Sequence, residues 1–155
     1  MPDSPLTAPR PVADLESALT VLRENGGRVS TSRRALLRVM FDAEGPLPVE
    51  QIASAAVPSL DVPSTYRTLE RLEQVGLVRH VHLGHGPGLY ELARAGEREY
   101  AWCESCGKAV SLAPDALDEA RDVIERTIGY RPRFGHFPMV GLCSECLARG
   151  AAPGR

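Results

Sequence analysis

Residues 64–92 read STYRTLERLEQVGLVRHVHLGHGPGLYEL, and this stretch decides the expected fold. Its first part predicts a helix over residues 64–75, because leucines and valines recur there at helical spacing until a glycine ends the pattern. Its second part predicts a β-hairpin over residues 77–92, with a glycine-rich turn between two short apolar runs. A helix followed directly by a hairpin is typical of a winged helix-turn-helix. An α+β domain without a nucleic-acid role has the same pattern and stays an alternative.

Three further helices are expected before this stretch. Apolar residues recur at helical spacing in three segments, residues 14–25, 30–44 and 49–56. Short polar residues that can cap a helix stand at the start of the first two: Asp14, and then Ser30, Thr31 or Ser32. Together with the hairpin, these helices predict an N-terminal winged-helix DNA-binding domain over residues 14–93.

The composition limits what the protein can be. Its 155 residues are 43% hydrophobic and 25% charged, which is typical of globular proteins and excludes a disordered or collagen-like chain. Eighteen Lys and Arg against twenty Asp and Glu give a net charge of −2, so any DNA binding must be local. Residues 23–38 contain five arginines and only one acidic residue. Within this segment, Arg28 and Arg33 are candidate phosphate ligands. Charge runs are, however, more often solvated helix faces.

The sequence predicts a cytoplasmic protein without a membrane partner. Its first residues, Met-Pro-Asp-Ser, lack the basic region and apolar core of a secretion signal, and Arg38 interrupts the longest apolar stretch, residues 35–41. The two ends, residues 1–13 and 148–155, are rich in proline or in small residues and are expected to be flexible.

The four cysteines form two C-x-x-C pairs, Cys103 with Cys106 and Cys143 with Cys146, with thirty-six residues between the pairs. Two such turns direct four thiolates at one point, which is the ligand set of a closed structural zinc site. A pair of disulfides is disfavoured by the expected cytoplasmic location. A thioredoxin-like redox site is disfavoured because no thioredoxin βαβ pattern precedes either pair.

A small second domain is predicted around these cysteines, over residues 94–147. Strands near residues 110–112 and 137–142 flank a helix that begins at Pro114 and ends at Gly129. Zinc can close a core too small to hold alone, and pairing of open sheet edges across a two-fold axis predicts a homodimer. The expected fold class is therefore α+β: a winged helix-turn-helix followed by a small α/β dimerisation domain with a four-cysteine zinc site.

The first turns of the helix that begins at residue 64 carry the candidate base contacts, Ser64, Thr65, Tyr66 and Arg67. Arg67 suits guanine or a phosphate, since its guanidinium offers two parallel donors. Tyr66 can pack on a thymine methyl group, and it is equally plausible as a partly buried core aromatic.

The order of these parts resembles the ferric uptake regulator (Fur) family of metal-dependent bacterial transcription regulators, over about residues 14–147. The matching segments are residues 28–34 (RVSTSRR), 64–69 (STYRTL), 76–78 (GLV), 103–108 (CESCGK) and 141–146 (GLCSEC). The resemblance implies a homodimer that binds a palindromic operator in double-stranded DNA and represses genes for metal uptake or oxidative defence. It also implies that Tyr66 and Arg67 contact bases and backbone, and that zinc at the four cysteines is structural.

The chain departs from this family at the usual regulatory metal site. The family's histidine-rich run before the first cysteine reads EREYAW at residues 97–102, so Arg98 and Tyr100 stand where two ligands are usual. Pro46 and Ser111 stand at two further positions where the family often has a ligand.

A relocated regulatory site for Zn²⁺, Ni²⁺ or Fe²⁺ is one hypothesis. Its candidate ligands are His80, His82, His85, Glu99 and His136, with Glu91 and Glu97 as alternative carboxylates. The alternative is a regulator with the same DNA-binding frame and structural zinc but no sensed metal, which answers to another signal or partner. Two rivals from other classes are a thiol redox enzyme that uses Cys103 or Cys106 and a zinc-stabilised interaction module without DNA binding.

Overall fold

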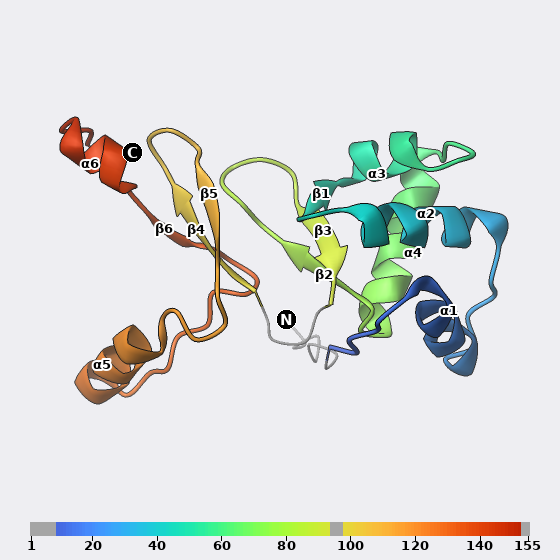
Figure 1. Cartoon of the computed structure of the whole chain (residues 1–155), viewed down its shortest axis with the longest axis horizontal. Helices are drawn as coiled ribbons and strands as arrows, with labels where there is room; N and C mark the ends of the chain where they lie inside the picture. Colours follow the sequence, from blue (N-terminus) through green and yellow to red (C-terminus); the bar gives the residue numbers. More distant parts are fainter. Residues whose placement is uncertain (1–8, 94–97, 153–155) are drawn as a thin grey trace. The chain divides into compact units, whose positions relative to one another are not determined.

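The computed structural model describes residues 9–93 and 98–152, which form two compact units (Figure 1). The first unit is Met1–His80 with Gly88–Ala95, and the second is Val81–Pro87 with Gly96–Arg155. The tip of the predicted hairpin therefore belongs to the second unit. The expected boundary between residues 93 and 94 lies outside the described residues, as do parts of both ends expected to be flexible.

Helices make up most of the first unit. They are α1 (Leu15–Glu24), α2 (Thr31–Asp42), α3 (Val49–Ala55) and α4 (Val62–Gln74). The carboxylate of Asp14 accepts a hydrogen bond from the Ser17 amide at 2.8 Å, and the hydroxyl of Ser30 accepts one from the Arg33 amide at 3.2 Å. Asp14 and Ser30 are thus the N-caps of α1 and α2, because each satisfies an amide that has no partner within the helix.

α4 begins two residues before the predicted start. Asp61 caps it, since its carboxylate accepts a hydrogen bond from the Ser64 amide at 2.8 Å. Pro63 lies in the first turn, where its missing N–H leaves no hydrogen bond unmade. The prediction that Ser64 opens the helix is therefore wrong, because it treated the proline as a barrier rather than as a first-turn residue.

A three-stranded sheet completes the first unit. Its strands are β1 (Leu47–Pro48), β2 (Val78–Val81) and β3 (Leu89–Leu92), in the order β1-β3-β2. β1 pairs antiparallel with β3, with Leu47 opposite Tyr90. β2 and β3 are the arms of the hairpin predicted from residues 77–92, which is confirmed.

The core of the first unit is formed by side chains from all four helices and from the hairpin. The buried apolar cluster consists of Ala18, Leu19, Leu22, Leu36, Leu37, Met40, Val49, Ile52, Leu69, Leu72, Val75, Leu77, Val78, Tyr90 and Leu92. The apolar stripe predicted for α4 faces this cluster. The opposite side of α4, which includes Arg67, is exposed.

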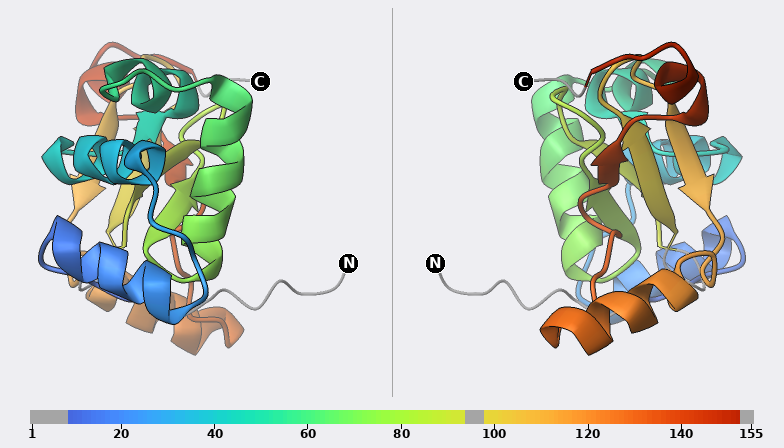
Figure 2. Two further views of the ribbon diagram at one scale, coloured as in Figure 1. Left: turned by 90° about the vertical axis from the view of Figure 1, so that its right-hand side faces the viewer. Right: turned by 90° about the vertical axis from the view of Figure 1, so that its left-hand side faces the viewer.

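The second unit has a sheet of β4 (Glu99–Cys103), β5 (Ala109–Leu112) and β6 (Met139–Gly141), in the order β5-β4-β6. β4 is antiparallel to β5 and parallel to β6. The helices α5 (Asp118–Ile128) and α6 (Ser144–Ala148) lie at opposite ends of this sheet (Figures 1 and 2). No helix in residues 9–93 or 98–152 is long and apolar enough to cross a lipid bilayer.

The predicted helix from Pro114 begins later, at Asp118. The chain first makes two tight turns, in which the amides of Ala116 and Asp118 donate to carbonyls three residues earlier, at 3.0 and 3.1 Å. β4 and α6 were not predicted. Each is short, and neither shows a clear period of apolar residues.

Truncation of Leu72 tests the core of the first unit. Leu72 in α4 is 0% exposed, so Leu72→Ala should lower the free energy of unfolding by about 2–5 kcal/mol. Urea unfolding followed by circular dichroism measures this loss. The control is Val57→Ala at an 86% exposed residue, which should change the free energy by less than about 0.5 kcal/mol. Equal losses in both variants would contradict the assignment of Leu72 to the core.

Candidate zinc site and nucleic-acid interface

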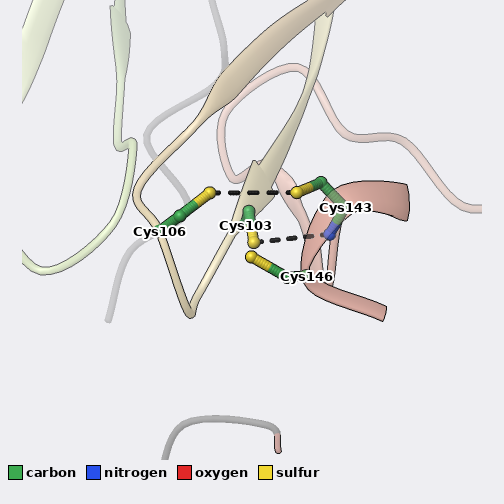
Figure 3. Close-up of side chains that lie close together, drawn as sticks. All are labelled: Cys103, Cys106, Cys143 and Cys146. Atoms are coloured by element: carbon green, nitrogen blue, oxygen red, sulfur yellow. Dashed lines mark hydrogen bonds between the residues drawn. The ribbon is translucent and has the colours of Figure 1, made fainter. Parts of the chain in front are cut away.

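The four cysteines come together from two segments of the second unit, the end of β4 with the turn that follows it and the start of α6 (Figure 3). Cys103 is the last residue of β4, and Cys106 lies in the turn that leads to β5. Cys143 is the N-cap of α6, and Cys146 lies within that helix. Gly107 has φ 75° and its amide donates to the Cys103 carbonyl at 2.8 Å, so glycine lets the first turn close.

The geometry of the cluster fits one tetrahedral ion. The four sulfur atoms all lie within 4.8 Å of one another, and the Cys106 and Cys143 sulfurs are 3.8 Å apart. Zinc with four sulfurs at about 2.3 Å separates neighbouring sulfurs by about 3.8 Å. A disulfide would need about 2.0 Å, and all four cysteines are free. Within residues 9–93 and 98–152, no other group of three or more His, Cys, Asp or Glu side chains has this arrangement.

Hydrogen bonds prepare two of the sulfurs to be thiolates. The pKa of Cys103 falls to about 6, chiefly because the Cys143 amide donates to its sulfur at 3.3 Å. The pKa of Cys146 is lowered by Arg149, whose guanidinium nitrogen is 3.2 Å from the sulfur. The Lys108 amide lowers the pKa of Cys106, but the neighbouring cysteine sulfurs outweigh it and raise this pKa to about 11. A bound cation would favour the thiolate form, because an opposite charge stabilises it.

The predicted regulatory ligands do not form a cluster like that of the four cysteines among the described residues. The structure brings together His82 and His136, whose ring centroids are 5.3 Å apart, and the His82 amide donates to the His136 carbonyl at 3.1 Å. His85 lies against Trp102 at 5.9 Å, and His80 stacks on Tyr90 at 4.7 Å. A regulatory site built from these histidines stays a prediction.

Glu99, the predicted carboxylate ligand, is buried and engaged elsewhere. It forms an ion pair with Arg121, and its second oxygen accepts a hydrogen bond from the Phe134 amide at 2.9 Å. Of the alternative carboxylates, Glu91 forms an ion pair with Arg79, and Glu97 lies outside the described residues.

The predicted DNA contacts on α4 differ in exposure. Arg67 is exposed, and Tyr66 is half-buried against the core. The Ser64 hydroxyl donates to the Asp61 carboxylate at 2.6 Å, which lowers the pKa of Asp61. Thr65 is 0% exposed and donates its hydroxyl to the Asp61 carbonyl at 2.8 Å. The expectation that the Thr65 side chain contacts DNA is therefore corrected, because it lies on the core side of the helix.

The arginine-rich segment contains internal contacts as well as exposed charge. Arg28 is exposed, whereas Arg33 is half-buried and donates to the Arg28 carbonyl. Arg34 forms an ion pair with Glu16 of α1. The patch is therefore weaker than the sequence count indicates, although Arg23 and Arg38, like Arg28, are exposed.

The sequence profile of the ferric uptake regulator family matches residues 24–133. The chain belongs to this family. The match runs from the end of α1 to the segment after α5, and so includes α4, the hairpin and the first cysteine pair. The predicted resemblance to the ferric uptake regulator family is confirmed.

Relatives of known function and solved structures agree with this assignment. The chain is similar to the peroxide operon regulator of Bacillus subtilis, with 26% identity over 136 residues that cover 86% of this chain and 93% of the relative. Its fold is similar to that of the Helicobacter pylori ferric uptake regulator, which has three functional metal-binding sites. The TM-score is 0.68 at 21% identity, with 89% of this chain and 97% of that chain covered.

A zinc uptake regulator solved in complex with zinc and DNA has a similar fold, with a TM-score of 0.52 and 20% identity over 89% of this chain and 95% of that chain. Members of the ferric uptake regulator family are metal-responsive transcription regulators. The rival interpretation as a thiol redox enzyme is therefore overturned.

Sequence reasoning missed Asp61 and Arg121 as site residues. Asp61 lies two residues before Pro63, and a capping residue followed by a first-turn proline was the available signal. Arg121 gave no signal, because a charged residue on a predicted helix is normally solvated.

Removal of one cysteine tests the cluster. Protein purified without chelator should contain about one zinc ion per chain, as expected for a closed tetrahedral site. Cys146→Ser should lose that zinc, because it deletes a buried ligand and leaves three thiolates. Elemental analysis measures both. Ser144→Ala, which changes an exposed neighbour on α6, should keep full zinc content. Full zinc content in Cys146→Ser would contradict a four-thiolate site.

Proposed function

We propose that the protein is a cytoplasmic, homodimeric transcription repressor that binds a palindromic operator and uses zinc at its four cysteines as a structural ion. The observation that carries the proposal is the match of the ferric uptake regulator family across the recognition helix, the hairpin and the first cysteine pair. The exposed face of α4 and the geometry of the cysteine cluster support it.

α4 acts as the recognition helix. The side of α4 opposite the core is exposed near its start, where a recognition helix contacts bases in the major groove. Arg67 there offers a bidentate contact to guanine or a contact to phosphate. Asp61 caps the helix through hydrogen bonds from the amide and the hydroxyl of Ser64, and the positive charge of Arg67 also helps to lower its pKa. Ser64, Tyr66, Arg28 and Arg33 are proposed as secondary contacts to bases and phosphates.

The second unit forms the dimer. Within its described residues, the buried apolar side chains are those of Val81, Tyr100, Cys103 and Cys146. Many larger apolar side chains are exposed instead: Val110, Val123, Ile128, Tyr130, Phe137, Met139, Val140 and Leu147. An exposed apolar surface of this extent on a small unit favours association with a second copy, which would bury it. A two-fold symmetric dimer then matches two half-sites of a palindrome.

Zinc is proposed as structural rather than catalytic. Four protein ligands leave no open coordination position for water or substrate. The site joins the end of β4 to α6, and Lys108 reinforces the junction through an ion pair with Glu145 at 3.0 Å.

A second divalent metal as the regulatory signal rests on fewer observations. The rings of His82 and His136 are nearly perpendicular, at 81°, and two imidazoles on one tetrahedral ion have centroids about 5.2 Å apart, close to the observed 5.3 Å. Zn²⁺, Ni²⁺ or Fe²⁺ bound there would need further ligands from solvent or from another chain. A regulator without a sensed metal at these histidines is the alternative.

Substitution of Arg67 tests DNA recognition. Arg67→Ala should weaken binding by about 5- to 150-fold, because one good arginine contact contributes about 1–3 kcal/mol. Fluorescence anisotropy at fixed salt measures the affinity for duplex DNA that the wild type selects from a random library. Arg126→Ala, at an exposed arginine of α5, is the charge-matched control and should bind as the wild type does. Unchanged binding by Arg67→Ala would contradict the proposed Arg67 contact, whereas a wild type that selects no duplex would favour the interaction module.

Charges placed on the exposed apolar surface test the dimer. Val110→Asp in β5 and Ile128→Asp in α5 should each shift the protein from dimer to monomer, because a dimer would have to bury an unpaired carboxylate. Light scattering coupled to size-exclusion chromatography measures the mass. Val57→Asp, in the first unit and 86% exposed, should remain a dimer. A monomeric wild type at micromolar concentration would refute the proposed dimer.

A further inference from the structure

Arg121 is an unusual residue of the second unit because it is charged and buried. It lies on α5 and is 7% exposed, and its ion-pair partner Glu99, at the first residue of β4, is 5% exposed. A buried charge is stable only where its partners replace the lost water. The contacts of Arg121 therefore indicate which groups stabilise its charge.

Three oxygen atoms from three segments surround the guanidinium. One terminal nitrogen pairs with the Glu99 carboxylate of β4, and the other donates to the Asp118 carboxylate of α5 at 2.7 Å. The Nε–H donates to the Pro132 carbonyl at 3.2 Å. Since Glu99 also accepts from the Phe134 amide, the cluster ties β4 to α5 and to the segment that leads to β6.

This set of oxygens is the kind that hard divalent cations bind. Mg²⁺, Ca²⁺ and Mn²⁺ take carboxylates and backbone carbonyls from separate segments and so hold those segments together. Here the guanidinium of Arg121 holds the three segments together. Arg131 lies 4.0 Å from Asp118, but its shorter ion pairs are with Asp122 and Glu125, at 2.7 and 2.8 Å. Arg121 is therefore the main cation of the cluster.

We propose that Arg121 is a permanent internal cation that occupies, among the oxygens of Glu99, Asp118 and Pro132, the place of a divalent metal ion. A guanidinium stays charged at any physiological pH, and no chelator removes it. The second unit therefore keeps this part of its shape without a metal ion there, and Glu99 is not available to a regulatory metal. Given the proposed function, operator binding does not respond to divalent metal through this cluster.

A gain of metal binding tests the proposal. In the full-length, zinc-loaded protein, Arg121→Ala should bind about one Mn²⁺ per chain, because it leaves two carboxylates and a carbonyl without a cation. Electron paramagnetic resonance of free Mn²⁺ measures the binding without DNA, so the result does not depend on the proposed function. Mn²⁺ at roughly 100 times Kd should also raise the Tm of Arg121→Ala by about 5 °C or more.

Matched variants separate this cluster from other Mn²⁺ ligands. Arg131→Ala removes an exposed arginine that pairs mainly with Asp122 and Glu125, and it should behave as the wild type does. The double variant Arg121→Ala/Asp118→Asn should lose the added Mn²⁺ site. A folded Arg121→Ala that binds no more Mn²⁺ than the wild type would overturn the proposal.

If Arg121→Ala does not fold at any Mn²⁺ concentration, Mn²⁺ binding by the wild-type protein tests the proposal instead. Mn²⁺ binding by the wild type that Asp118→Asn abolishes would overturn the proposal, because the cluster would then hold a metal with Arg121 present. Absence of such binding is the expected result.

Discussion

Polar groups hold β4 in place at both of its ends, and the second unit depends on these two sets of interactions. Its first residue, Glu99, binds Arg121 of α5, and its last residue, Cys103, belongs to the sulfur cluster with α6. β4 is also the central strand, with β5 and β6 on either side. The unit buries few apolar side chains of its own, so the hydrophobic effect within one chain contributes little to holding these elements together. Two polar clusters fix the geometry, and the exposed apolar surface is where the proposed dimer would form.

The two clusters use different chemistry for the same purpose. Four soft thiolates suit zinc, which a chelator can remove and an oxidant can displace. Two carboxylates and a carbonyl receive a guanidinium, which is covalently part of the chain. With the proposed zinc ion, one end of β4 would depend on the metal supply of the cell, whereas the other end would not. The first unit needs neither cluster, because its helices and hairpin share a continuous apolar core.

Sequence patterns predicted the helices and strands that pack on a continuous apolar core. The four helices and the hairpin of the first unit follow apolar periodicity, and the cysteine spacing predicted the sulfur cluster without reference to any element. The start of α4 was misplaced because Pro63 was read as a boundary, and Thr65 was assigned to DNA because sequence position does not show which side of a helix is buried. β4 was missed because it is short and shows no clear apolar period, and its first residue, Glu99, is a buried charge. Glu99 could be recognised as a metal ligand type from sequence, but its partner Arg121 lies twenty-two residues away and no spacing rule connects them.

The division of the hairpin between the two units has a further consequence. The arms of the hairpin lie mainly with the first unit, whereas its tip, Val81–Pro87, belongs to the second, where Trp102 packs against Gly84. The chain therefore passes between the units three times rather than once. Two units joined by a single tether can be separated by one cut, and each half then retains all of its own contacts. Here no single cut has that result. A fragment that contains all of the first unit also contains the hairpin tip, Val81–Pro87, and the rest of the second unit is then on the other fragment. No single cut of the chain therefore yields the two units as separate pieces.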